Sequence, residues 1–546
     1  MTSALPPSAP ADLRPYQRAA VEAVLAARRA GKRRLLVHLP TGAGKTVIFS
    51  HLARLAKRQV LVLAHREELL TQARDKLARA VGGAAVVAIE RGALRAPSDA
   101  HVLVCSIRSL HEERLARVMR GRDVGLIVYD ECHHAAADDN LRVLRQLGVF
   151  EPAFAGTLLG FTATTSRGDG QGLDDVFEEI VYSRALPELI DDGFLAPLRG
   201  YRISTTADLR QLSTTGLDFD EERLAEAVDI EERNALVARS IQELARDRRT
   251  IAFCVTVTHA RHLAHALNAL GVTAGIVHGA MPGEARAQAL ADFREGRVQV
   301  LTNVGVLTEG FDDPGVSCVA MARPTRSEGL YAQCVGRGTR LHPGKTDCLI
   351  LDFVDLTELS LCTLPSLFGA PRDLDLRGGD ASEARRAWLR IEFDRPGFEL
   401  EAGAVTLAEI QDRAASFDPL TLRAHEDVRA ISSHAWFSLG RHGVGLHVQR
   451  AGRVSEVLVV RRAGRGKCWE VVMDGRPMER FSRLEAAVEA VDFELAQMGR
   501  GVVLSASPEA AWRRAAPPAT EDAPANLGEA LRLIVWRRYH PRRGAH

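Results

Sequence analysis

Residues 39–46 read Leu-Pro-Thr-Gly-Ala-Gly-Lys-Thr and combine the residue types that can hold a polyphosphate. Backbone N–H groups in a glycine-rich turn at a helix N-terminus attract anions. Gly42 and Gly44 permit backbone conformations that a Cβ would forbid. The Lys45 ammonium can pair with phosphates, and the Thr46 hydroxyl can ligate Mg²⁺. Leu39 stands where the usual pattern has a first glycine, so the turn indicates a nucleotide site only if matching parts follow.

A second group suited to chemistry is Asp130 and Glu131, which follow the apolar run 126–129. A carboxylate at a strand end beside a phosphate-binding turn can hold Mg²⁺ through water, which makes Asp130 and Thr46 the predicted magnesium site. Glu131 is placed to orient and deprotonate an attacking water. A zinc site at residues 132–134, Cys-His-His, is the alternative, but consecutive residues at one strand end do not readily converge on a tetrahedral metal.

A third group lies far along the chain, at Arg337 and Arg340. Their spacing predicts one helical turn, with both guanidinium groups on one face and directed across a cleft at the γ-phosphate. An arginine placed in this way stabilises transition-state charge and is worth roughly 10³–10⁵ in rate. The alternative is a helix with two surface arginines.

The elements that must position these groups are short apolar runs of the kind found in buried parallel strands. Polar residues follow many of the runs, at the strand ends where open α/β sheets bind ligands. Helix capping and solvated charge are the alternative explanation for each such residue. The runs occupy residues 35–37, 60–64, 102–105, 126–129 and 158–161, then 250–255, 275–279, 298–301 and 349–354.

Composition limits the remaining possibilities. The chain has 546 residues, enough for three or four domains, and a formal net charge of only +1, so any nucleic-acid surface must be a local basic patch. No apolar stretch approaches the ~20 residues of a membrane helix, so no membrane partner is expected. The eight cysteines include no Cys-x-x-Cys pair, and residues 1–12 do not resemble a signal peptide, which favours a reducing cytoplasm.

The order of these groups resembles the helicase-like ATPases of superfamily 2. Gln17, residues 40–46, residues 130–133 and residues 162–164 match the motifs of that family's first lobe. The Asp-Glu-Cys-His sequence, together with Leu-Arg-Pro-Tyr-Gln at 13–17, most resembles the branch of XPB-type, RadD-type and type I restriction motors. The resemblance implies an α/β fold of two tandem RecA-like domains with parallel sheets. ATP and Mg²⁺ would be the cofactors and nucleic acid the partner, DNA being favoured over RNA by the branch.

The resemblance also assigns roles to individual residues. The Gln17 amide could pair with the adenine edge, and Asp312 would reach the ribose. The implied catalytic residues are Lys45, Asp130, Glu131, Gln333, Arg337 and Arg340. The implied nucleotide contacts are Arg14, Gln17, Thr41, Gly42, Ala43, Gly44, Lys45, Thr46, Gly310 and Asp312. The implied nucleic-acid contacts are His65, Arg66, Ser106, Arg108, His278 and Thr302.

The predicted domains are a disordered N-terminus at 1–12, a first lobe at 13–197 and a second lobe at 198–356. A linker or accessory segment would occupy 357–430, with Arg372 to Arg386 as its most linker-like piece. Short β-type runs separated by glycine-containing turns, followed by a helical pattern, predict a small β-meander-plus-helix module at 431–505 and then a tail at 506–546.

The expected activity is that of a DNA helicase or translocase. An RNA helicase, and a nucleotide-gated clamp that separates no strands, are the alternatives. No nuclease constellation is visible, which sets the chain apart from a complete restriction subunit. In the C-terminal module, Trp436 and Trp469 near Arg461, Arg462, Arg465 and Lys467 could stack on single-stranded nucleic acid, although a place in the core is the favoured interpretation.

Overall fold

The computed structural model contains the whole chain, and some of its residues are not described. It describes residues 13–497 apart from 65–66, 83–86, 93, 98, 164–172, 211, 213, 216–217, 309, 358, 395–404, 417–427, 429–430, 433, 435, 439–442, 451–452, 463–467 and 474–475. The chain forms two compact units, which divide after Glu383. The terminal segments 1–12 and 506–546 of the sequence prediction lie outside the described residues.

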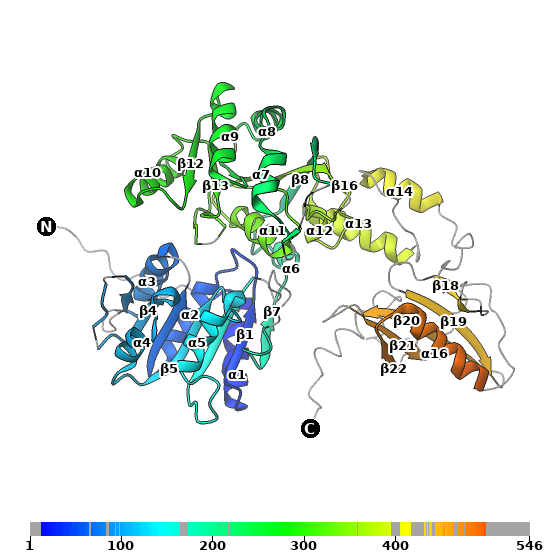
Figure 1. Ribbon diagram of the computed structural model, residues 1–546, viewed down its shortest axis with the longest axis horizontal. Helices are drawn as coiled ribbons and strands as arrows, with labels where there is room; N and C mark the ends of the chain where they lie inside the picture. The colour runs from blue at the N-terminus through cyan, green and yellow to red at the C-terminus, as the bar shows by residue number, and fades with distance from the viewer. Residues whose placement is uncertain are drawn as a thin grey trace. The chain divides into compact units, whose positions relative to one another are not determined.

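The first lobe is a parallel sheet covered on both faces by helices (Figure 1). Alternate residues of its central strands enter two separate cores: Leu61 and Ile127 pack on one face, and Val62 and Val128 on the other. The strands in spatial order are β3 (Val87–Glu90), β4 (Val102–Ser106), β2 (Gln59–Ala64), β5 (Val124–Asp130), β6 (Thr157–Thr162), β1 (Arg34–His38) and β7 (Glu179–Ser183). The helices are α1 (Pro15–Arg29), α2 (Lys45–Leu55), α3 (Glu67–Val81), α4 (Glu112–Met119), α5 (Asp138–Gln146) and α6 (Leu186–Asp191).

The second lobe, green in Figure 1, is also a parallel sheet between helices. Its strands in spatial order are β12 (Ala274–His278), β13 (Val300–Val304), β11 (Thr250–Phe253), β14 (Cys318–Met321), β15 (Cys348–Leu356) and β8 (Leu198–Asp208). Its helices are α7 (Glu221–Val228), α8 (Glu231–Leu244), α9 (Val257–Ala269), α10 (Gly283–Arg294) and α11 (Glu328–Val335).

The predicted linker or accessory segment after β15 is packed against the second lobe at its start. Residues from α12 (Leu364–Leu367) to the beginning of α13 (Ala381–Asp394) fold back onto β8, where Gly378 N donates to Gly200 O at 2.7 Å. Leu364 and Phe368 join the core of the first unit. The sequence concealed this packing because charged residues surround the few apolar ones.

The second unit contains the small module that the β-type runs predict. Five antiparallel strands follow one another in sequence order, and a helix packs its Ala487 and Val488 against them. The strands are β18 (Phe437–Ser438), β19 (Gly443–Arg450), β20 (Arg453–Arg462), β21 (Cys468–Met473) and β22 (Arg476–Phe481), and the helix is α16 (Leu484–Gln497). The fold class is thus confirmed. Among the described helices of both units, none has the length and apolar character needed to cross a bilayer.

Candidate functional site

The glycine-rich turn joins β1 to α2 as predicted, with Lys45 as the first residue of the helix. Gly42 and Gly44 have φ values of 88° and 77°, which side chains rarely tolerate. A Cβ at Gly42 would lie 2.7 Å from Thr339 Oγ1, and one at Gly44 would lie 2.7 Å from Gln17 Nε2. The Thr41 hydroxyl is buried without a hydrogen-bond partner. These features fit a backbone cradle for phosphate oxygens.

An ion pair joins the turn to the end of β5. Lys45 Nζ donates to Glu131 Oε1 at 2.8 Å, and the two side chains are only 10% and 9% exposed. Burial by itself would raise the pKa of Glu131, but the Lys45 charge and the neighbouring His133 outweigh it and hold that pKa well below its usual range. Glu131 has a φ of 52°, a conformation outside the strand that turns its side chain toward Lys45. The predicted catalytic lysine and the predicted base therefore neutralise each other in this structure.

Asp130 lies at the end of the same strand and is 7% exposed. Its Oδ1 accepts from Glu131 N at 3.1 Å, while Thr46 stands half-buried in the first turn of α2. Within the part of the chain that the structure describes, no three His, Cys, Asp or Glu side chains converge on a possible metal position. Cys132 is completely buried in a hydrophobic core, so the alternative zinc site has no structural support.

Gln17 lies over the turn, where its Nε2 donates to Ala43 O at 3.3 Å and its Oε1 accepts from Arg14 N at 3.1 Å. Both ends of the amide are thus used within the protein, so adenine recognition would have to replace these bonds. Two aromatic residues that sequence reasoning missed complete this corner. Tyr16 donates to Ala43 O at 2.6 Å and packs against Phe194 with ring centroids 4.9 Å apart. The position of Tyr16 directly before Gln17 was the available signal.

The second lobe contributes Arg337 and Arg340, which lie three residues apart beyond the end of α11. Helix α11 ends at Val335, and a short 3₁₀ turn, η3 (Gly336–Gly338), follows. Arg337 is 4% exposed and donates to Phe311 O at 2.8 Å and Thr308 O at 2.9 Å. Arg340 donates to Phe311 O at 3.1 Å. Both guanidinium groups therefore face the Phe311 carbonyl, from a 3₁₀ turn and the residues just after it rather than from an α-helix, and that of Arg337 is engaged inside its own lobe.

Residues 336–340 nevertheless pack directly on the glycine-rich turn. Thr339 Oγ1 donates to Thr41 O at 3.4 Å, and Thr339 O accepts from Ala196 N at 2.7 Å. A Cβ at Gly336 would come within 2.5 Å of Thr41 Cβ. Arg340 Cγ lies 3.6 Å from where a Cβ of Gly42 would be. Of the two arginines, Arg340 is therefore the one beside the predicted phosphate position.

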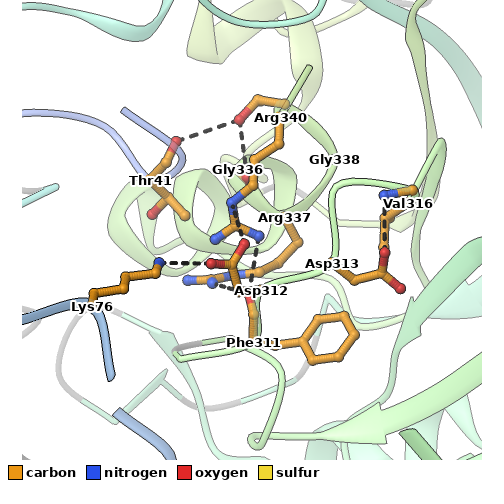
Figure 2. Close-up of polar contacts among 12 residues, drawn as sticks. Thr41, Lys76, Phe311, Asp312, Asp313, Val316, Gly336, Arg337, Gly338 and Arg340 are labelled. Atoms are coloured by element: carbon orange, nitrogen blue, oxygen red, sulfur yellow. Dashed lines mark hydrogen bonds and ion pairs between the residues drawn. The ribbon is translucent and has the colours of Figure 1, made fainter. Parts of the chain in front are cut away.

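Asp312 is held by two cations rather than left open for a ribose. Lys76 Nζ from α3 donates to Asp312 Oδ2 at 2.7 Å, and Arg340 Nε lies 3.2 Å from Oδ1. Figure 2 shows Lys76 and Arg340 pointing at the same carboxylate. Burial opposes ionisation, but these cations prevail and lower the pKa of Asp312. A ribose contact at Asp312 would have to share the carboxylate with these two cations. Lys76 carried no sequence signal because it is one lysine of an amphipathic helix.

Two more residues of the second lobe were predicted to contribute. Gln333 lies on α11 and is 7% exposed. Gly310 has a φ of 74°, so the turn before Asp312 requires a glycine there.

The predicted nucleic-acid contacts divide into three groups. His65 and Arg66 lie outside the described residues. Ser106, Arg108 and His278 lie at or just after strand ends, with Arg108 exposed. Thr302 is wrong as a phosphate contact because it is fully buried and its hydroxyl donates to Ala260 O at 3.0 Å and Gly275 O at 3.2 Å.

In the C-terminal module, Trp436 is a core residue. It is 2% exposed, and its Nε1 donates to Ser432 Oγ at 2.9 Å. Trp469 is half-buried and packs on the same core. The side chains of Arg461, Arg462, Arg465 and Lys467 are outside the described part of the module. Stacking on Trp436 is therefore excluded by its burial.

The two-lobed fold and the turn with its Lys45–Glu131 pair define a P-loop nucleoside triphosphatase. Residues 11–167 match the family described as "Type III restriction enzyme, res subunit", and residues 232–342 match "Helicase conserved C-terminal domain". The chain belongs to the helicase-like ATPases of superfamily 2, as its motifs predict.

Named relatives extend this similarity. The chain is 37% identical to the "Putative mitochondrial ATP-dependent helicase irc3" of Schizosaccharomyces pombe, over 66% of this chain and 60% of the relative. It is 31% identical to the "Putative ATP-dependent helicase IRC3" of Saccharomyces cerevisiae, over 68% and 55%. It is 28% identical to the "Type I restriction enzyme EcoAI endonuclease subunit" of Escherichia coli, over 63% and 46%. The chain thus spans about half the length of these relatives.

Proposed function

We propose that this chain is a nucleic-acid-dependent ATPase that moves along or remodels DNA, as a helicase or translocase. The observation that carries the proposal is the convergence of two lobes on one turn. Lys45 and Glu131 meet there at 2.8 Å, and residues 336–340 of the second lobe pack against Thr41 and Gly42. With contacts from both lobes on the turn, a reaction there would change how the lobes are held together.

The residues present fit ATP. The backbone of residues 41–46 and the Lys45 side chain would hold the phosphates. Gln17, with Tyr16 and Phe194 beside it, would lie at the adenine base. Thr46 and Asp130 would hold Mg²⁺, which commonly takes one or two protein ligands and completes its shell with water and phosphate. When bound, ATP supplies the phosphoanhydride bond, and Mg²⁺ supplies positive charge that offsets the negative charge of the ATP phosphates.

The ion pair suggests how the site changes state. Lys45 would exchange Glu131 for phosphate oxygens, which leaves the carboxylate of Glu131 able to hold and deprotonate a water. Before that exchange the Lys45 charge and His133 hold the carboxylate ionised, which is the form that a base requires. Arg340 would then act from the second lobe on transition-state charge.

DNA is the proposed partner because the restriction subunit and the helicase relatives favour it over RNA. Ser106, Arg108 and His278 are the proposed contacts from the described residues, with His65 and Arg66 beside them in sequence. We also propose a cytoplasmic location, since the described cysteines are free thiols. A role in DNA repair is part of the same proposal, and loss-of-gene sensitivity to DNA damage would test it.

Steady-state ATPase assays with single-stranded DNA, duplex DNA and RNA would test the function, with strand displacement measured beside them. We expect DNA to raise the rate, and rising salt to weaken DNA binding steeply because phosphate contacts release counterions. Glu131→Gln should bind ATP without hydrolysing it. Stimulation by RNA alone would indicate an RNA helicase, and DNA stimulation without displacement would indicate a translocase or clamp. A rate indifferent to every nucleic acid would refute the proposal.

A further inference from the structure

Lys345 ties together two loops of the second lobe. It lies between η3 and β15, and its Nζ donates to three backbone carbonyls: Val316 O at 2.5 Å, Arg340 O at 2.9 Å, and Gly338 O. An ammonium has three donor hydrogens, so these carbonyls account for all of them. Because the donor is charged, such bonds are stronger than neutral ones.

Two of the three carbonyls bracket the part of the chain that meets the first lobe. Gly338 and Arg340 flank Thr339, whose hydroxyl donates to Thr41 O and whose carbonyl accepts from Ala196 N. Holding both carbonyls fixes the 338–339 and 340–341 peptide planes, which lie on either side of the Thr339–Arg340 pair. The position of the Arg340 Cα relative to the glycine-rich turn is thereby fixed as well.

The third carbonyl connects this segment to the loop that orients the arginine side chain. Val316 closes the turn that begins at Asp313, and its N–H donates to Asp313 O at 3.4 Å. The same loop carries Phe311, whose carbonyl accepts from Arg340 Nη1, and Asp312, which pairs with Arg340 Nε. Figure 2 shows Phe311, Asp312, Asp313 and Val316 on this loop beside Arg340. Lys345 therefore links the backbone of Arg340 to the loop that binds its guanidinium.

We propose that Lys345 is a positioning residue for Arg340: all three of its donors are used on backbone carbonyls of the second lobe, and these bonds keep the arginine beside the phosphate turn. The inference rests on the proposed ATPase function. Without the Lys345 ammonium, residues 336–340 lose the hydrogen bonds that join them to the loop containing Val316, so Arg340 would sample orientations away from the glycine-rich turn. Misplacement of a catalytic group by about 1 Å can cost about 100-fold in rate.

Lys345→Met tests the proposal, because methionine keeps much of the side-chain length and removes all three donors. We expect kcat for ATP to fall by about 10- to 100-fold with KM within about twofold. Affinity for ADP should be unchanged, while the extra thermal stabilisation by ADP with aluminium fluoride over ADP alone should be lost. In nucleotide-free protein, amide hydrogens of residues 336–340 should exchange faster. Lys345→Arg, which keeps charge and donors, should recover part of the rate.

Gln299→Leu is the matched control, since Gln299 Nε2 also donates to two carbonyls of the same lobe, Ala245 O at 3.1 Å and Arg246 O at 2.7 Å. It should lower thermal stability without changing kcat. An equal loss of kcat in Gln299→Leu, or an unchanged kcat and exchange rate in Lys345→Met, would overturn the inference. If Lys345→Met fails to fold, Lys345→Arg must show the reduced kcat with unchanged KM, or the inference fails. If the wild-type chain hydrolyses no ATP, the proposed function fails. Amide hydrogen exchange in the nucleotide-free protein still tests whether the Lys345 bonds hold residues 336–340 in place.

Discussion

Breaking the Lys45–Glu131 pair should destabilise the nucleotide-free protein by an amount that the structure lets us estimate. The atoms are 2.8 Å apart and the side chains are about one tenth exposed. Removing one partner of a buried pair typically costs about 3–5 kcal/mol, because the other charge stays buried. Lys45→Met should therefore lower the free energy of unfolding by about that much. Glu131→Gln leaves the ammonium an acceptor and should cost less, about 1–3 kcal/mol.

The double variant Lys45→Met/Glu131→Gln leaves no unpaired charge, so its cost should fall short of the summed single costs by about 2 kcal/mol or more. Urea unfolding followed by far-ultraviolet circular dichroism would measure the cycle. Tryptophan fluorescence would not serve, because all five tryptophans lie at position 388 or later. The surface pair Arg58–Asp123, with side chains 36% and 72% exposed, is the control, and Arg58→Met should cost no more than about 1 kcal/mol.

The pH dependence gives a second check on the same pair. The depressed pKa of Glu131 means that its stabilising contribution is present above its unfolded pKa, about 4.3, and is lost as pH falls through the folded value. In Lys45→Met the compensating charge is gone and burial alone would raise the pKa of Glu131. The cost of Lys45→Met should therefore shrink as the buffer is acidified. In the double-variant cycle, a coupling energy between Lys45 and Glu131 below about 0.5 kcal/mol, which is the range of independent sites, would refute the reasoning.

Three further predictions concern the second lobe. Arg340→Ala should lower kcat for ATP more than it raises KM, because its charge acts mainly in the transition state, and the opposite split in steady-state kinetics would remove its assigned role. Lys76→Ala breaks the interlobe ion pair with Asp312, which is worth no more than about 1 kcal/mol at its exposure. Fluorophores on the two lobes should therefore show that the lobes separate more easily without nucleotide, and an unchanged distance distribution would count against this. Burial raises the pKa of Asp352, which accepts from Tyr331 Oη at 2.8 Å, to about 6. Stability relative to Asp352→Asn should therefore fall by on the order of 3 kcal/mol as pH rises from about 4 to about 6 and then stay level, and a flat difference between the two proteins would contradict it.

The central strands could be predicted because each is a continuous apolar run. Four strands of the two parallel sheets carried a weaker signal. The longest of them, β8, mixes buried positions with exposed and half-buried ones and so forms no continuous apolar run. β7 has mostly exposed side chains, as its place at the sheet edge requires, so no buried run marks it. β3 has only four residues, and three of them are half-buried. β14 is fully buried but short, and its Cys318, Ala320 and Met321 are not the β-branched residues that favour strands.

The local backbone geometry of the site could also be predicted from the sequence. The positive φ values of Gly42 and Gly44 follow from a tight turn between a strand and a helix, which the residue types already specify. Glu131 lies at the end of a strand that its own neighbours define. Contacts of this kind depend on a few consecutive residues, and a motif therefore contains most of the information.

The sequence by itself therefore determined the two parallel sheets, the phosphate turn and the carboxylates beside it, because hydrophobic period and turn chemistry are local properties. Tertiary structure decided which side chains meet across long separations. Lys76 and Asp312 lie 236 positions apart, and only the packing of the lobes joins them. Tertiary packing also buries the Thr302 side chain in the core and brings the Lys345 ammonium to the backbone carbonyl of Arg340. A side chain's direction is set by its backbone frame and its packing neighbours, and residue type alone specifies neither.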